Sequence, residues 1–183
     1  MRNFIESNIK GKNVLILFLI TNIVYAAMLL VTIPKVMSFT GEMKLFDMLP
    51  MGYSLEYANS LLKILGETGR SAYLYNQIPL DMIYPLLFGI TYAFIIAFFL
   101  KKLNKLDGSL FYVSLLPLAA GLFDYFENLG IISMLLNYPN EMDTLIMTTN
   151  VFTILKSALT TFTFITLIIV MVVLGVKKVL KKA

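Results

Sequence analysis

Charged and polar side chains interrupt apolar segments of this sequence, and their spacing limits the chemistry open to them. Asp124, Glu127 and Asn128 stand at positions i, i+3 and i+4, so a helix places them on one face. Asp81 and Lys156 interrupt two other apolar runs. Carboxylates grouped with a lysine can form an anionic binding site, a general acid and base, or a buried ion pair.

The sequence contains no histidine and no cysteine. This excludes disulfides, imidazole or thiolate metal sites, Ser-His-Asp and Cys-His catalysis and histidine-ligated haem. Any chemistry must therefore use carboxylates, lysine, hydroxyls and backbone carbonyls. Asp81 could join Asp124 or Glu127 around a divalent cation through oxygen ligands alone. No other cofactor or metal site is predicted.

Composition predicts an integral membrane protein. Hydrophobic residues make up 58% of the 183 residues and charged residues 14%, whereas soluble domains average about 45–50% and about 25%. The surplus apolar surface must face a lipid bilayer. Each of four apolar runs reaches the ~20 residues that cross a bilayer as a helix. We expect one domain over residues 1–183, an all-α polytopic four-helix bundle. The predicted spans are residues 13–34, 79–100, 109–136 and 148–176.

Basic residues predict the orientation of these spans. Ten of the fifteen lysines and arginines fall on one side of a four-span topology, accompanied there only by Glu6 and Asp107. The positive-inside rule places both termini in the cytoplasm of a cell-membrane protein. Topology thus accounts for the net charge of +4, which gives no support to nucleic-acid binding. The ten residues are Arg2, Lys10, Lys12, Lys101, Lys102, Lys105, Lys177, Lys178, Lys181 and Lys182.

The long outer loop, residues 35–78, carries a predicted amphipathic helix over residues 54–66. Ser54 suits the N-cap and Gly66 the C-terminal end. We expect this helix to cap the bundle, because it has few basic residues and is tethered at both ends. A second helical stretch should begin at Thr68 and run into the second span, with a kink at Pro79. The apolar stripe comprises Leu55, Ala58, Leu61, Leu62 and Leu65.

Polar stripes on several spans predict a shared interior. Glu127 and Lys156 each lie about nine residues from the outer end of their span, or ~13 Å deep. In the second span, Pro85 cannot donate to the carbonyl of Asp81, which should leave that carbonyl free beside a carboxylate. The stripes are Asp81, Tyr84, Phe88 and Tyr92 in the second span, and Thr149, Thr153, Lys156, Thr160 and Thr163 in the fourth.

Two acids, Asp124 and Glu127, face Lys156 in this arrangement. One carboxyl must therefore carry a proton, bind a cation or meet another group. Arg70, just outside the second span, is one such group, although Glu67 could instead hold it at the surface. A purely structural interpretation also stands, in which Lys156 pairs with the acids to stabilise the bundle. Charges this deep in a membrane are functional by default.

The candidate site residues and several residues of the outer loop also form a pattern along the sequence. It comprises Tyr53-Ser54, Leu65-Gly66-Glu67-Thr68-Gly69-Arg70, Tyr73, Asp81-Met82-Ile83-Tyr84-Pro85, Asp124-Tyr125-Phe126-Glu127-Asn128 and Lys156. The pattern resembles a group of small four-span microbial membrane proteins that has no assigned activity. The resemblance extends from the outer helix to the fourth span, and it implies no substrate, cofactor or mechanism.

Three functions remain open from the sequence. The favoured one is an outward-facing intramembrane pocket that binds or transports a small cationic or lipidic molecule. Its residues would be Asp81, Tyr84, Asp124, Glu127, Asn128, Lys156 and Arg70. The second is a lipid-modifying enzyme that uses paired carboxylates, although no nucleophile or phosphate-binding motif accompanies them. The third is a non-catalytic subunit that assembles with a membrane partner protein. Four spans are few for a transporter, so the favoured function expects a homo-oligomer.

Overall fold

Helices form most of residues 2–180, which are the residues that the computed structural model describes, and no strand occurs among them. Side chains are described for residues 5–180. The elements are α1 (Arg2–Asn8), α2 (Gly11–Ala27), η1 (Met28–Thr32), α3 (Ile33–Met37), η2 (Phe46–Met48), α4 (Leu55–Ala72), η3 (Tyr73–Gln77), α5 (Ile78–Lys102), η4 (Ser109–Leu115), α6 (Leu116–Asn137) and α7 (Asp143–Leu180).

Within the described residues, four helical stretches are long and apolar enough to cross a membrane: Gly11–Met37, Leu55–Lys102, Ser109–Asn137 and Asp143–Leu180. Each contains one predicted span and most extend beyond it. Helix α7 extends beyond its predicted span at both ends, because hydropathy marks only the apolar middle of a helix. Acidic residues at a helix N-terminus and basic ones at its C-terminus favour such extension by complementing the helix dipole, and α7 has both.

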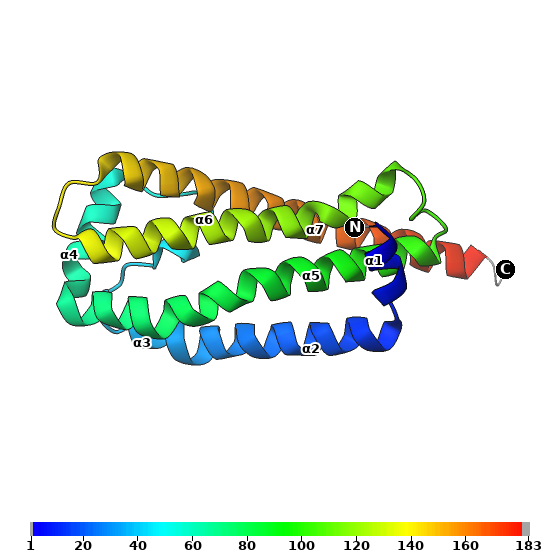
Figure 1. Cartoon of the computed structure of the whole chain (residues 1–183), viewed down its shortest axis with the longest axis horizontal. Coiled ribbons are helices and arrows are strands. Elements are labelled where there is room, and N and C mark those ends of the chain that lie inside the picture. The colour runs from blue at the N-terminus through cyan, green and yellow to red at the C-terminus, as the bar shows by residue number, and fades with distance from the viewer. Residues whose placement is uncertain (1, 181–183) are drawn as a thin grey trace.

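The long helices run side by side, and α5 lies at the centre (Figure 1). It packs against α2, α6 and α7. The most apolar window of the stretch that contains α5 is 56% buried, against 11% for α7. Helix α4 lies across one end of the bundle, here called the α4 end, whereas α1 and the last turns of α7 lie at the opposite, terminal end (Figure 1).

Two π-helical segments, η1 and η3, precede the prolines of the first two long stretches. Each is followed by an Ile-Pro pair, Ile33-Pro34 and Ile78-Pro79. Proline cannot donate to the carbonyl four residues earlier, and a π-turn is one way for a helix to accommodate the interruption. The irregularity predicted at Pro79 therefore takes the form of this π-turn. The two segments also contact each other, since Thr32 hydrogen-bonds to the side chain of Gln77.

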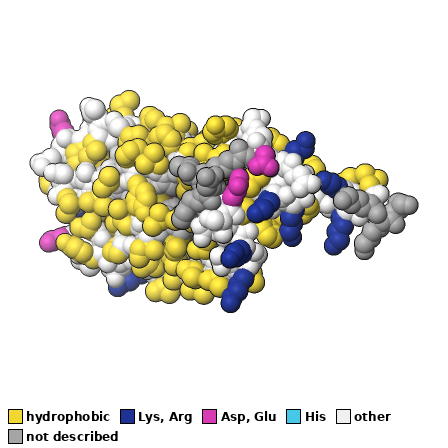
Figure 2. Space-filling view, turned by 45° about the vertical axis from the view of Figure 1, so that its right-hand side comes forward, with side chains coloured by type: hydrophobic (Ala, Val, Ile, Leu, Met, Phe, Trp, Pro, Cys, Tyr) yellow, Lys and Arg dark blue, Asp and Glu magenta, His cyan; other side chains and the backbone are white. Residues whose placement is uncertain are grey.

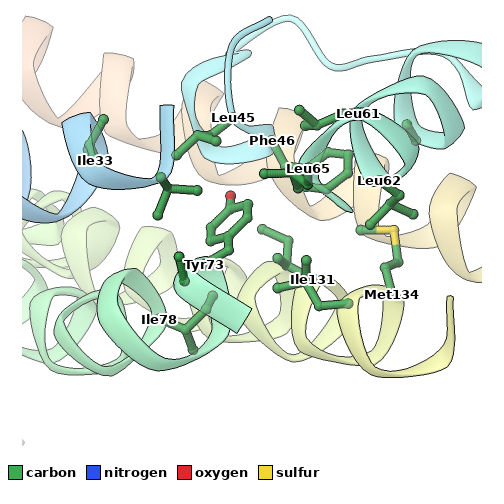
Figure 3. Packing of buried hydrophobic residues seen from close by; sticks show 14 of the residues in the cluster. Ile33, Leu45, Phe46, Leu61, Leu62, Leu65, Tyr73, Ile78, Ile131 and Met134 are labelled. Carbon is green, nitrogen blue, oxygen red and sulfur yellow. The ribbon is translucent and has the colours of Figure 1, made fainter. Parts of the chain in front are cut away.

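Helix α4 caps the α4 end of the bundle. Its N-cap is Ser54, whose hydroxyl accepts a hydrogen bond from the Tyr57 N–H at 3.1 Å, as predicted. Gly66 interrupts the helix with a φ of 59°, in the left-handed region that glycine adopts without strain. The apolar stripe packs onto Phe46, Ile131 and Met134, as Figure 3 shows. The predicted capping position is therefore the one observed.

Two apolar clusters occupy the two ends of the bundle, and polar residues lie between them. The first cluster joins α4, η2 and α6, and the second joins α1, the last turns of α5 and the loop that follows. Lysines end both α5 and α7, and dark-blue basic side chains gather toward the terminal end in Figure 2. Of the basic residues used to predict orientation, Lys181, Lys182 and the side chain of Arg2 lie outside the described residues.

Candidate functional site

An ion-pair cluster joins α6 to α7. Lys156 Nζ contacts Glu127 Oε2 and lies 3.3 Å from Asp124 Oδ1. Glu127, which is 0% exposed, also accepts a hydrogen bond from Thr153 Oγ1 at 2.7 Å. A buried charge is tolerable only when it is paired and hydrogen-bonded. Lys156 is therefore occupied by both acids that the sequence placed opposite it.

Asn128 connects the same face of α6 to α5. Its Nδ2 donates to the backbone carbonyl of Asp81 at 2.8 Å. This is the carbonyl that Pro85 leaves without a helical partner, so the prediction of a free carbonyl was wrong. A buried carbonyl without a partner costs free energy, and an amide on the neighbouring helix removes that cost. Asn128 thus has a positioning role between helices, and it does not line the cavity described next.

A cavity of about 550 Å³ lies between the helices and the segment around η2. Asp81 and Asp124 line it, together with Lys156 and Tyr84, whereas Glu127 lies behind this wall. Asp81 is only 4% exposed, and no group of the described residues hydrogen-bonds to its Oδ2. The other lining residues include Thr21, Asn22, Tyr25, Met28, Leu29, Asp47, Met48, Pro50, Phe88, Tyr92, Ala120, Ser157, Thr160, Thr161 and Phe164.

Asp47, a third carboxylate at the cavity, was missed in the sequence. It lies in η2 and accepts a hydrogen bond from the Tyr73 hydroxyl at 2.8 Å. An aspartate between the apolar pairs Leu45-Phe46 and Met48-Leu49 is a signal that could have found it. The segment continues to Tyr53, and burial raises the pKa of its phenol. The backbone N–H of Tyr53 donates a hydrogen bond to Asn150 Oδ1 at 2.8 Å.

Aromatic side chains from α2, α5 and α7 form a continuous row in the cavity lining. Tyr25 of α2 stacks on Tyr84 with ring centroids 5.3 Å apart, and Tyr84 contacts Phe88 at 5.8 Å. The contacts continue from Phe88 to Tyr92 at 4.7 Å and from Tyr92 to Phe164 of α7 at 5.2 Å. Rings of this kind attract a cation through the negative face of their π-systems.

Arg70 does not line the cavity, contrary to the expectation that it balances the acids. Its Nη1 donates to the carbonyl of Leu62 at 2.9 Å, and its guanidinium lies 4.3 Å from the ring centroid of Tyr138. The break at Gly66 leaves helical carbonyls without backbone partners near that point, and an arginine that follows can satisfy one of them. Arg70 therefore stabilises the junction of α4 with α6.

Glycines let α6 approach its neighbours closely. A Cβ on Gly121 would lie 2.6 Å from the backbone oxygen of Pro85, and one on Gly130 would lie 2.0 Å from Thr149 Oγ1. Small residues at such contacts allow helix backbones to come together. The polar residues of α6 reach α5 and α7 because of this short separation.

The arrangement is suited to holding a positive charge. Asp47, Asp81, Asp124 and Glu127 gather near Lys156, so the acids exceed the base. Among the described residues, no group of three or more Asp, Glu, His or Cys side chains has the arrangement of a metal site. No protein-family model, curated protein sequence or solved structure matches the chain.

Proposed function

We propose that the four long helices cross a lipid bilayer and that the cavity between them binds or transports a small organic cation. Membrane insertion is supported by the length and hydropathy of the helices. An even number of crossings puts both termini on one side, and α1 lies at the same end as the last turns of α7 (Figure 1). The lysines that end α5 and α7 favour the cytoplasm for that end.

Cysteine labelling tests this topology cleanly, because the chain has no cysteine of its own. Glu141 lies in the loop between α6 and α7, Lys178 lies in the last turn of α7, and both are exposed. In intact cells a membrane-impermeant maleimide should label Glu141→Cys and should label Lys178→Cys only after permeabilisation. The reverse pattern would overturn the orientation, and labelling of both in intact cells would overturn an even number of crossings.

One observation carries the cation proposal: Asp81 lines the cavity, and one of its carboxylate oxygens is buried without a hydrogen-bond partner among the described residues. Lys156 pairs with Glu127 and Asp124, and no ion pair joins it to Asp81 in the part of the chain that the structure describes. A cationic ligand supplies the missing charge, and the rings of Tyr84 and Phe88 add cation–π attraction. An anionic ligand would meet three carboxylates. The cavity also has the size typical of small-molecule sites, which run about 300–1,000 Å³.

Equilibrium binding of phenethylammonium to the protein in lipid nanodiscs tests the proposal. This probe carries an ammonium group for the carboxylates and a ring for the aromatic row of the cavity lining. We expect Asp81→Asn and Asp124→Asn each to weaken binding at least about tenfold, or about 1.4 kcal/mol. Asp143→Asn, in the exposed first turn of α7, is the matched control and should bind like the wild type.

Neutral phenethyl alcohol separates charge recognition from apolar burial. It should bind far more weakly than phenethylammonium to the wild type and equally to the aspartate variants. If phenethylammonium bound equally to the wild type and to both cavity variants, the carboxylates would have no role in recognition. The cation proposal would then be wrong.

A further inference from the structure

The cavity has two chemically different halves along the helix axis. On α5, Asp81 comes first, and Phe88 and Tyr92 follow about 10 and 16 Å farther along at helical rise. On α7, Lys156 comes first, and Phe164 follows about 12 Å farther along. Asp81, Lys156 and Tyr84 thus lie in the half toward the α4 end, and the rings of Phe88, Tyr92 and Phe164 lie in the other half. A ligand that fills both must join a charged group to an apolar body.

The segment 45–53 covers the cavity at the α4 end. Leu45 and Phe46 are fully buried in the apolar cluster beneath α4. Asp47 is bonded to Tyr73, and the N–H of Tyr53 is bonded to Asn150 on α7. The segment is therefore attached on both sides, and Met48 and Pro50 contribute to the cavity lining there. A ligand that arrived through this end would have to displace the segment, which Leu45 and Phe46 anchor in that cluster.

The side of the cavity between α2 and α7 is open by contrast. Lining residues on both sides are exposed: Tyr25 of α2 is 41% exposed, Leu29 of η1 is 43% exposed, and Phe164 of α7 is 39% exposed. Both helices pack against α5, which forms the wall between them. These exposed side chains belong to the apolar middle of helices that we propose to cross the bilayer. The opening therefore faces lipid.

From this geometry we infer that the ligand is an amphiphilic amine that reaches the cavity sideways from the bilayer. This inference rests on the proposed function and specifies its substrate class. The ammonium group lies between the carboxyl groups of Asp81 and Asp124, which both line the cavity. The alkyl chain follows the rings of Phe88, Tyr92 and Phe164 and leaves between α2 and α7. Phosphate-bearing lipids are disfavoured, because their headgroups would bring an anion to the three carboxylates.

Tryptophans introduced one at a time test the path of the ligand's alkyl chain. The protein sequence contains no tryptophan of its own, so each variant has a single reporter. Phe164→Trp places a reporter at the opening on α7, and Tyr25→Trp places a second reporter across the opening on α2. The control is Ile168→Trp, at an exposed position of α7 that does not line the cavity. The probe is a terminally brominated dodecylammonium, whose bromine quenches nearby tryptophan. In nanodiscs we expect saturable quenching at Phe164→Trp or Tyr25→Trp and only unsaturable, collisional quenching at Ile168→Trp. Adding Asp81→Asn should raise the half-saturation concentration at least about tenfold.

Three results would overturn the inference in distinguishable ways. Equal collisional quenching at all three positions, with carboxylate-dependent binding of phenethylammonium intact, would show a cation site filled from water and no lateral path. Loss of both signals would overturn the proposed function together with the inference. Saturable quenching that is the same for the brominated dodecyl alcohol would show an apolar groove without cation selectivity, which also contradicts the inference.

Discussion

Replacing Lys156 with methionine is expected to lower the free energy of unfolding by about 3–5 kcal/mol, the usual cost of removing one partner from a buried ion pair. Methionine keeps the length and apolar stem of lysine and removes the charge. Glu127 would then be left in a fully buried position with Thr153 as its remaining partner. Thermal denaturation in detergent, followed by circular dichroism, should show a large fall in Tm.

A second substitution should restore most of this stability. In Lys156→Met with Glu127→Gln, the buried carboxylate is replaced by a neutral amide that can still accept from Thr153. Asp124 is also left unpaired, but it lines the cavity and can be solvated there. Lys178→Met, at an exposed site in the last turn of α7, is the control and should change Tm little. Equal stability of Lys156→Met and the wild type would mean that Lys156 contributes nothing net to the bundle.

The polar face of α6 was predictable because it depends only on helix geometry. A helix brings residues at i, i+3 and i+4 together whatever surrounds it, and Asp124, Glu127 and Asn128 lie on one buried face. The same argument predicted the threonine stripe of α7, and local capping chemistry predicted the start of α4 at Ser54. These features need no knowledge of which helices are neighbours.

The partners of these residues could not be predicted in the same way, because tertiary contacts decide them. Asp47 reaches the cavity through a loop that folds back against Tyr73, 26 positions away in sequence. The carbonyl freed by Pro85 is matched by Asn128, which is 47 positions away. Arg70 was assigned to the acids by charge balance alone. A nearby carbonyl and the ring of Tyr138 are its observed partners.

The contact between α5 and α6 at Gly121 determines whether the site residues of α5 lie close to those of α6. A Cβ at Gly121 would clash with the backbone oxygen of Pro85 on the facing helix. A backbone atom cannot move aside as the end of a flexible side chain can. A larger residue must therefore move a whole helix. Such a movement would also stretch the hydrogen bond from Asn128 to the Asp81 carbonyl, only one to two helical turns away on each helix. Stability and the shape of the cavity depend on the same contact.

We therefore expect Gly121→Val to lower the free energy of unfolding by about 3 kcal/mol, the upper part of the range for overpacked sites, and to abolish phenethylammonium binding. Gly175→Val is the matched control, since a Cβ at Gly175 meets no atom within 4 Å and valine is the better helix former. The control should match or slightly exceed the wild type in Tm and bind normally. If Gly121→Val kept both its Tm and its binding, the close approach of α6 to α5 would not be what assembles the site.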